Sequence, residues 1–175
     1  MTETEQNGSA WVFGYGSLIY KVDFPVLESH IASIQGWQRR FWQGSHDHRG
    51  TPEAPGRVVT LISSPDSICK GVAYRVSHDV FEHLDHREKN GYERVPVNIT
   101  LTKAGDRVDG ITYSAAQDNH AFLGPAPMAE LAAHISRSRG PSGSNTDYLL
   151  QLADALREIG EQDEHIFELE ALLNS

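Results

Sequence analysis

The order of hydrophobic patterns along the chain limits its fold more than any other feature. Short runs of β-branched and aromatic residues fill the first two thirds, at 11–13, 37–43, 57–62, 68–76, 92–102 and 108–114. Helical patterns occupy 77–89 and then dominate the end of the chain, at 127–139, 146–159 and 164–172. Strands and helices segregated in this way are typical of α+β proteins. We therefore expect an α+β fold, with a sheet or partly closed barrel covered by α-helices.

Turn-forming residues set the expected boundaries. Residues 63–66, Ser-Ser-Pro-Asp, predict a hairpin turn between the runs 57–62 and 68–76. Residues 44–56 are rich in Gly and Pro and predict a long irregular loop, of a kind that is often functional. Ser77 and Asn145 are the expected N-caps of the helices 77–89 and 146–159.

Composition excludes several classes of protein. With 175 residues, the chain suits one domain, which we place at 11–175 after a disordered polar tail, 1–10, that lacks the features of a signal peptide. The formal net charge of −9 argues against a nucleic-acid partner. No apolar run reaches the roughly 18 residues of a membrane span. The single cysteine, Cys69, permits no internal disulfide and favours a cytoplasmic location. The sequence leaves the oligomeric state open, as a monomer or a weak dimer.

One carboxylate interrupts an apolar helix face. Phe81, Leu84 and Glu88 follow the i, i+3, i+7 spacing of one face. A carboxylate that faces a core or cleft has a raised pKa, which suits a general acid/base. The alternatives at this point are a structural ion pair or a Glu88 that turns to solvent at the helix end.

A glycine-flanked turn and an arginine cluster are the other candidate features. Gly14-Tyr15-Gly16-Ser17-Leu18 follows a predicted strand, and such a turn either holds an oxyanion on its N–H groups or is purely structural. Four arginines fall in or near the 44–56 loop, at 39, 40, 49 and 57, and favour a carboxylate-binding site, although we expect at least two of them to pair with the abundant acids. The nine histidines give no zinc pattern, so no metal is expected.

These segments together resemble the ChaC family of glutathione-specific γ-glutamylcyclotransferases. The matching blocks are 12–19, 21–25, 39–45, 47–50, 55–61, 71–75, 87–92, 123–127, 140–143, Asn145 and 148–149. They run in family order over nearly the whole chain. The resemblance implies a mixed barrel of the γ-glutamylcyclotransferase type and cleavage of glutathione to 5-oxoproline and Cys-Gly without a cofactor.

The resemblance also implies the roles of individual residues. It makes Glu88 the catalytic acid/base. The implied substrate contacts are Val12, Phe13, Gly14, Tyr15, Gly16, Ser17, Leu18, Gln43, Ser45, Arg57, Asn145 and Tyr148. Two alternatives remain: a cyclotransferase for other γ-glutamyl peptides or amines, and a non-catalytic regulatory binding protein.

Overall fold

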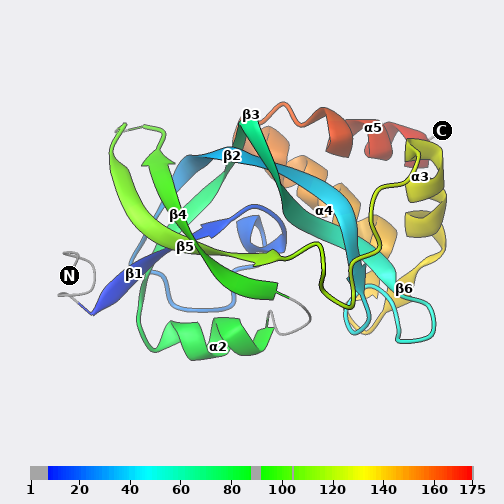
Figure 1. Cartoon of the computed structure of the whole chain (residues 1–175), viewed down its shortest axis with the longest axis horizontal. Coiled ribbons are helices and arrows are strands. Elements are labelled where there is room, and N and C mark those ends of the chain that lie inside the picture. The colour runs from blue at the N-terminus through cyan, green and yellow to red at the C-terminus, as the bar shows by residue number, and fades with distance from the viewer. Residues whose placement is uncertain (1–7, 88–91, 104, 175) are drawn as a thin grey trace. The chain divides into compact units, whose positions relative to one another are not determined.

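The computed structural model describes residues 8–87, 92–103 and 105–174 (Figure 1). Within these ranges the strands are β1 (Ser9–Gly14), β2 (Glu28–Ser45), β3 (Gly56–Ser77), β4 (Tyr92–Leu101), β5 (Arg107–Ala115), β6 (Arg139–Gly140) and β7 (Gly143–Ser144). The helices are the 3₁₀ turn η1 (Ser17–Ile19), α2 (Val80–Arg87), α3 (Met128–Arg137), α4 (Asn145–Glu158) and α5 (Glu164–Leu173). The expected α+β fold is confirmed.

The chain divides into two compact units, each built from two segments. The first comprises residues 1–38 and 63–114, and the second comprises 39–62 and 115–175. The two long strands, β2 and β3, contribute residues to both units.

A closed, mixed five-stranded barrel organises the first unit. The strand order is β1-β3-β2-β4-β5. β1 pairs antiparallel with β3, from Ser9 opposite Ser77 to Gly14 opposite Val72. It also pairs in parallel with β5, where Val12 lies opposite Ile111, and this pair closes the barrel. Closure removes the exposed sheet edges that would otherwise be free to pair with other chains.

The hydrophobic core of the first unit lies between the barrel and α2. Val12 and Val76 come from the strands, and Val80, Phe81 and Leu84 come from the helix. The predicted apolar face of this helix is therefore confirmed at Phe81 and Leu84. Leu84 is fully buried, so α2 is held against the barrel by side chains at helical spacing.

Three helices and a short hairpin complete the second unit. α3, α4 and α5 pack against one another (Figure 1), and their buried residues include Leu131, Ile135, Leu149, Leu152, Leu156, Ile166 and Leu169. β6 pairs antiparallel with β7, and Gly143, the first residue of β7, has a φ of 119°, which favours glycine. No helix of the described residues is long and apolar enough to cross a membrane.

The predicted hairpin at residues 63–66 is wrong. β3 runs without a break for 22 residues, from Gly56 to Ser77. Ser63, Pro65 and Asp66 are exposed in the middle of this strand. A strand segment that is exposed to solvent does not need to alternate apolar and polar side chains. The sequence of this stretch therefore has the same pattern as a turn.

Three other predicted boundaries also moved. β2 begins at Glu28, because 28–36 is a mostly polar strand segment without the aromatic residues that marked 37–43. Ser77 ends β3 instead of capping α2, and its hydroxyl donates to the Asp79 carboxylate. Ser144 caps α4 by accepting the Asp147 N–H, so Asn145 is the first helical residue.

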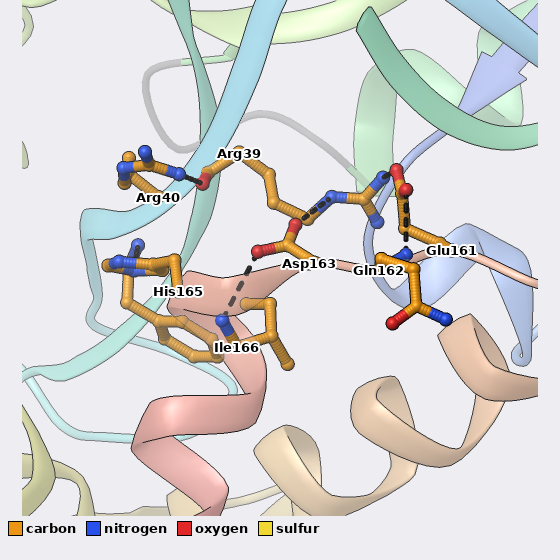
Figure 2. Close-up of polar contacts among 8 residues, drawn as sticks. Arg39, Arg40, Glu161, Gln162, Asp163, His165 and Ile166 are labelled. Carbon is orange, nitrogen blue, oxygen red and sulfur yellow. Dashed lines mark hydrogen bonds and ion pairs between the residues drawn. The ribbon is translucent and has the colours of Figure 1, made fainter.

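A buried cation ties α5 to β2 within the second unit (Figure 2). The Arg39 side chain is fully buried, and its Nε lies 3.0 Å from a carboxylate oxygen of Asp163. A second nitrogen of Arg39 lies 3.5 Å from Glu161. Asp163 also caps α5 by accepting the Ile166 N–H. Removing one partner from such a buried pair leaves an uncompensated charge, which is strongly destabilising.

His165 makes a hydrogen bond that only its neutral form can make. The Phe41 backbone N–H donates to His165 Nε2 at 3.1 Å. Burial, with the nearby Arg40 charge, lowers the pKa of His165 to about 3. The folded protein therefore keeps this imidazole neutral at pH values where the unfolded chain protonates it.

We predict that His165 makes the protein acid-sensitive. Unfolded His165 takes up a proton below its ordinary pKa of about 6.5, whereas folded His165 does so only near pH 3. The free energy of unfolding should thus fall as pH drops through this window, by at most about 1.4 kcal/mol per unit. In His165→Gln, the amide oxygen can accept the same N–H without titrating. Urea unfolding at several pH values should give a shallower profile for this variant. Parallel profiles for the two proteins would contradict the prediction, since other titrating groups, including Asp163, are common to both.

Candidate functional site

The turn at residues 14–18 follows β1 in the first unit and folds back closely on itself. A Cβ atom added at Gly14 would lie 2.8 Å from the Leu18 Cβ. One added at Gly71 on β3 would lie 2.1 Å from the Gly14 carbonyl oxygen. Neither Gly14 nor Gly16 has a positive φ, so the turn requires glycine at position 14 because of close approach.

Two tyrosine hydroxyls anchor the turn at its two ends. Tyr15 donates to the Tyr113 carbonyl on β5 at 2.6 Å, and Tyr74 donates to the Leu18 carbonyl at 2.6 Å. Both bonds are buried. Hydrogen bonds of this length inside a core fix the backbone between them, so the turn is a preorganised element.

The predicted contact residues of this segment other than Ser17 have little exposed side chain. Val12 and Phe13 are fully buried in the core, and Tyr15 and Leu18 are each 6% exposed. Ser17 is partly exposed. A substrate at this turn would therefore meet mainly its backbone and Ser17.

A cluster of polar side chains links α2 to β4 and β5. Arg94 donates to both carboxylate oxygens of Asp85, from Nε at 2.9 Å and from Nη2 at 2.5 Å. The Tyr113 hydroxyl donates to the same carboxylate at 2.6 Å. The Arg94 guanidinium also lies over the Phe81 ring, 4.7 Å from its centroid. Glu88, the predicted acid/base, lies outside the described residues.

The charges in this cluster shift the pKa values of its members. The hydrogen bonds from Arg94 hold the pKa of Asp85 below its usual value. Burial raises the pKa of Tyr113, and the Asp85 carboxylate raises it further. Asp85 is therefore an anion, and Tyr113 is a neutral donor, at any physiological pH.

The predicted contact residues of the second unit surround Arg57. The Asn145 side chain accepts the Arg57 N–H and donates to the Arg57 carbonyl, both at 2.7 Å. The Tyr148 hydroxyl accepts the Val59 N–H at 3.3 Å. The Ser45 hydroxyl accepts the Arg49 N–H at 2.9 Å. The structure thus brings Arg57, Asn145 and Tyr148 together at the start of β3, whereas Ser45 is bonded to Arg49 in the loop that precedes this strand.

Gln43 lies in a separate contact of the same unit. Its side-chain amide exchanges hydrogen bonds with the Asn119 amide, each 3.0 Å long. Gln43 is fully buried, so its donor and acceptor both need these partners.

Two buried arginines of this unit have no carboxylate partner among the described residues. The Arg57 guanidinium donates to the carbonyls of Phe41 and Gly124 at 3.0 and 2.7 Å, and burial lowers its pKa. Arg49 donates to the Ser144 carbonyl at 3.1 Å and lies 5.7 Å from the centre of the Tyr148 ring. Arg39, in contrast, pairs with Glu161 and Asp163. Arg39 is thus confirmed as an arginine that pairs with acids, and anion binding by the other arginines of the cluster stays a prediction.

No group of three or more His, Cys, Asp or Glu side chains within 8–87, 92–103 and 105–174 is placed to hold a metal ion.

The comparisons with known proteins identify the family. The family model described as ChaC-like protein matches residues 10–175, so this chain belongs to the ChaC-like family. It is 44% identical to γ-glutamylcyclotransferase 2-3 of Arabidopsis thaliana, over 91% of this chain and 85% of the relative. It is 41% identical to glutathione-specific γ-glutamylcyclotransferase 1 of Danio rerio, over 94% and 89% of the two chains.

A solved structure supports the same assignment of the fold. The crystal structure of a yeast γ-glutamyl cyclotransferase specific to glutathione superposes with a TM-score of 0.88. The two chains are 34% identical, and the match covers 96% of each. The mixed barrel with its helices is therefore the fold of a γ-glutamylcyclotransferase.

The sequence pattern gave no indication of the Asp85, Arg94 and Tyr113 cluster. Asp85 and Arg94 are exposed charged residues in an acidic chain, and Tyr113 occupies an ordinary strand position. The one available signal was their placement, because Asp85 comes three residues before Glu88 in the sequence and Arg94 comes six residues after it.

We predict that Asn145 is essential for stability. Asn145→Ala would leave the N–H and carbonyl of Arg57 without their buried partners. Each unsatisfied group costs about 1–3 kcal/mol, so the free energy of unfolding should fall by roughly 2–4 kcal/mol in urea titrations. Asn98→Ala, which removes an exposed amide, is the matched control and should change it by no more than about 0.5 kcal/mol. Equal losses in the two variants would refute this role.

Proposed function

We propose that this protein is a glutathione-specific γ-glutamylcyclotransferase that converts glutathione to 5-oxoproline and Cys-Gly. The observation that carries the proposal is the match, over nearly the full length of both chains, to a yeast enzyme with that specificity. The relative from Danio rerio carries the same activity in its name.

In the proposed reaction the nucleophile belongs to the substrate. Glu88 accepts a proton from the α-ammonium group of the γ-glutamyl residue. The freed amine attacks the γ-carbonyl carbon of the same residue, which forms the ring C–N bond. The tetrahedral intermediate then breaks its bond to the cysteinyl nitrogen, and Glu88 returns the first proton to this leaving amine. The second proton of the ring nitrogen passes to the same amine, so that 5-oxoproline keeps one lactam N–H and Cys-Gly leaves with an ammonium group. No water is consumed, and the enzyme supplies no covalent nucleophile.

The turn at residues 14–18 is the proposed cradle for the γ-glutamyl group. Its backbone N–H groups would stabilise the oxyanion, a contribution whose loss typically costs about 10²–10³ in rate. The anchors at Tyr15 and Tyr74 support this role, because an oxyanion site must be fixed before the reaction begins. Holding the γ-glutamyl chain in a near-cyclic conformer supplies most of the remaining rate increase.

The predicted contacts in the second unit are proposed to bind the substrate around Arg57. Its buried cation has no carboxylate partner among the described residues, which favours a carboxylate of the substrate. Asn145 and Tyr148 support the β3 segment that carries Arg57, and Ser45 supports Arg49 in the loop before it. Gln43 remains a proposed contact with its own support from Asn119.

Two alternative functions would give different results in turnover and binding experiments. Turnover of other γ-glutamyl peptides, but not of glutathione, would keep the chemistry and change the substrate. Binding without turnover of any of them would indicate a regulatory protein. The cytoplasmic location and the monomer or weak dimer state also stay predictions.

We predict that Glu88→Gln abolishes turnover without unfolding the protein. The purified wild-type protein, incubated with reduced glutathione and a chelator, should release 5-oxoproline and Cys-Gly. The amide of the variant cannot accept the ammonium proton, so kcat should fall by at least about 10²-fold. Chromatographic product analysis and circular dichroism measure the two properties. A folded variant with near-normal turnover would refute the role of Glu88, and loss of wild-type activity in chelator would refute a metal-free reaction.

We predict that Arg57→Gln mainly raises the KM for glutathione. A neutral side chain loses a charged contact to the substrate carboxylate, worth about 1.5–3 kcal/mol, which corresponds to roughly a 10–100-fold increase in KM. Arg139→Gln removes an exposed arginine of the same unit and serves as the control. Steady-state kinetics at a temperature where both variants are folded makes the comparison. An unchanged KM in Arg57→Gln removes this residue from the site.

A further inference from the structure

The imidazole of His134 links Arg57 to the end of the loop that precedes β3, entirely within the second unit. His134 lies on α3 and is partly buried. Its Nδ1 lies 3.2 Å from Arg57 Nε, and its Nε2 lies 2.7 Å from the Pro55 carbonyl oxygen. Both ring nitrogens are therefore bonded to the short segment 55–57, and the proposed reaction gives His134 no role.

The two bonds determine which ring nitrogen of His134 carries a proton. An arginine N–H can only donate, so Nδ1 is the acceptor in the bond from Arg57. A carbonyl oxygen can only accept, so Nε2 carries the proton and donates it to Pro55. His134 is thus a neutral imidazole in this arrangement. The bond to Pro55 selects the tautomer and the ring orientation that the bond from Arg57 requires.

The Pro55 carbonyl is held in place independently of the Arg57 side chain. A Cβ atom added at Gly56 would lie 2.7 Å from the side-chain oxygen of Asn145, so the backbone packs closely here. The Asn145 side chain also binds the N–H and the carbonyl of Arg57, both at 2.7 Å. The ring of His134 is therefore oriented by a backbone segment that is itself fixed by buried hydrogen bonds.

The hydrogen bonds of the Arg57 guanidinium to the described residues come from two of its three nitrogens. Nε donates to His134, and Nη1 donates to the carbonyls of Phe41 and Gly124 at 3.0 and 2.7 Å. Nη2 has no hydrogen-bond partner among the described residues. All three acceptors are neutral, so they orient the cation without cancelling its charge. Because a guanidinium is planar and rigid, two bonded nitrogens determine where the third one points.

We infer that His134 is a positioning residue for Arg57, which sets the plane of the guanidinium so that Nη2 binds a carboxylate of the substrate. The inference rests on the proposed role of Arg57 as a substrate contact. Two carbonyls at Nη1 alone would leave the plane able to swing about that nitrogen, and the bond from Nε to His134 removes this motion. A neutral imidazole does so without competing with the substrate for the positive charge, as a carboxylate at position 134 would.

Two substitutions separate the two bonds of the ring. In His134→Asn the side-chain oxygen takes about the place of Nδ1, so the bond from Arg57 is kept and the bond to Pro55 is lost. In His134→Gln the amide nitrogen reaches about the place of Nε2, so the bond to Pro55 is kept and the acceptor for Arg57 is lost. Each variant loses one hydrogen bond at the same site, so each is the stability control for the other.

The kinetic test compares KM and kcat for glutathione in these two variants. We expect KM to rise about 3–10-fold in His134→Gln and to stay within about twofold of the wild-type value in His134→Asn, with kcat within about twofold in both. Their thermal midpoints should fall by similar amounts. In the Arg57→Gln background, His134→Gln should cause no further rise in KM, because His134 acts only through Arg57. A KM in His134→Gln no higher than in His134→Asn would overturn the positioning role.

A second measurement does not depend on activity. Amide-type ¹H–¹⁵N spectra also show the Nε–H groups of buried arginines, and the signal of Arg57 is the one that disappears in Arg57→Gln. This N–H should exchange slowly with solvent in the wild-type protein and in His134→Asn, and at least about 10-fold faster in His134→Gln. Fast exchange in the wild-type protein, or equal exchange in the two variants, would overturn the inference even if one variant folds poorly. An inactive wild-type protein, or an unchanged KM in Arg57→Gln, would instead overturn the proposed function, whatever the exchange rates show.

Discussion

The turn that follows β1 in the first unit depends on two buried tyrosine hydroxyl groups. Tyr15 and Tyr74 each give a short hydrogen bond to a backbone carbonyl, one to β5 and one within the turn. Gly14 lets the chain fold back tightly between these anchors. The barrel provides both anchor points, because Tyr74 lies on β3 and the carbonyl that accepts from Tyr15 belongs to β5.

The second unit follows the same principle with an amide in place of a hydroxyl. The Asn145 side chain satisfies both backbone groups of Arg57 and thereby fixes the start of β3. The guanidinium of Arg57 is held by carbonyls, which orient a cation without neutralising it. Because this buried charge has no carboxylate partner among the described residues, we propose Arg57 as the contact for a substrate carboxylate.

Strands and helices with a strong hydrophobic pattern were predicted from the sequence. The predictions failed where exposed residues form a strand. The apolar face at Phe81 and Leu84 was visible because a helix repeats every 3.6 residues. The middle of β3 was not predicted as a strand, because its residues, such as Pro65, are exposed and show no hydrophobic pattern. For the candidate site, the resemblance to the family proposed the turn and Arg57. The hydrogen bond between Tyr113 and Asp85 joins residues 28 positions apart, so no local sequence pattern predicts it.

Cys69 gives the protein one further property. It is the single cysteine of the sequence, and only 2% of its surface is exposed, on β3. Thiol–disulfide exchange needs a thiolate that a disulfide can reach. The disulfide form of a thiol substrate such as glutathione therefore finds no accessible sulfur on the folded protein. Disulfide exchange at Cys69 therefore requires this part of β3 to open first.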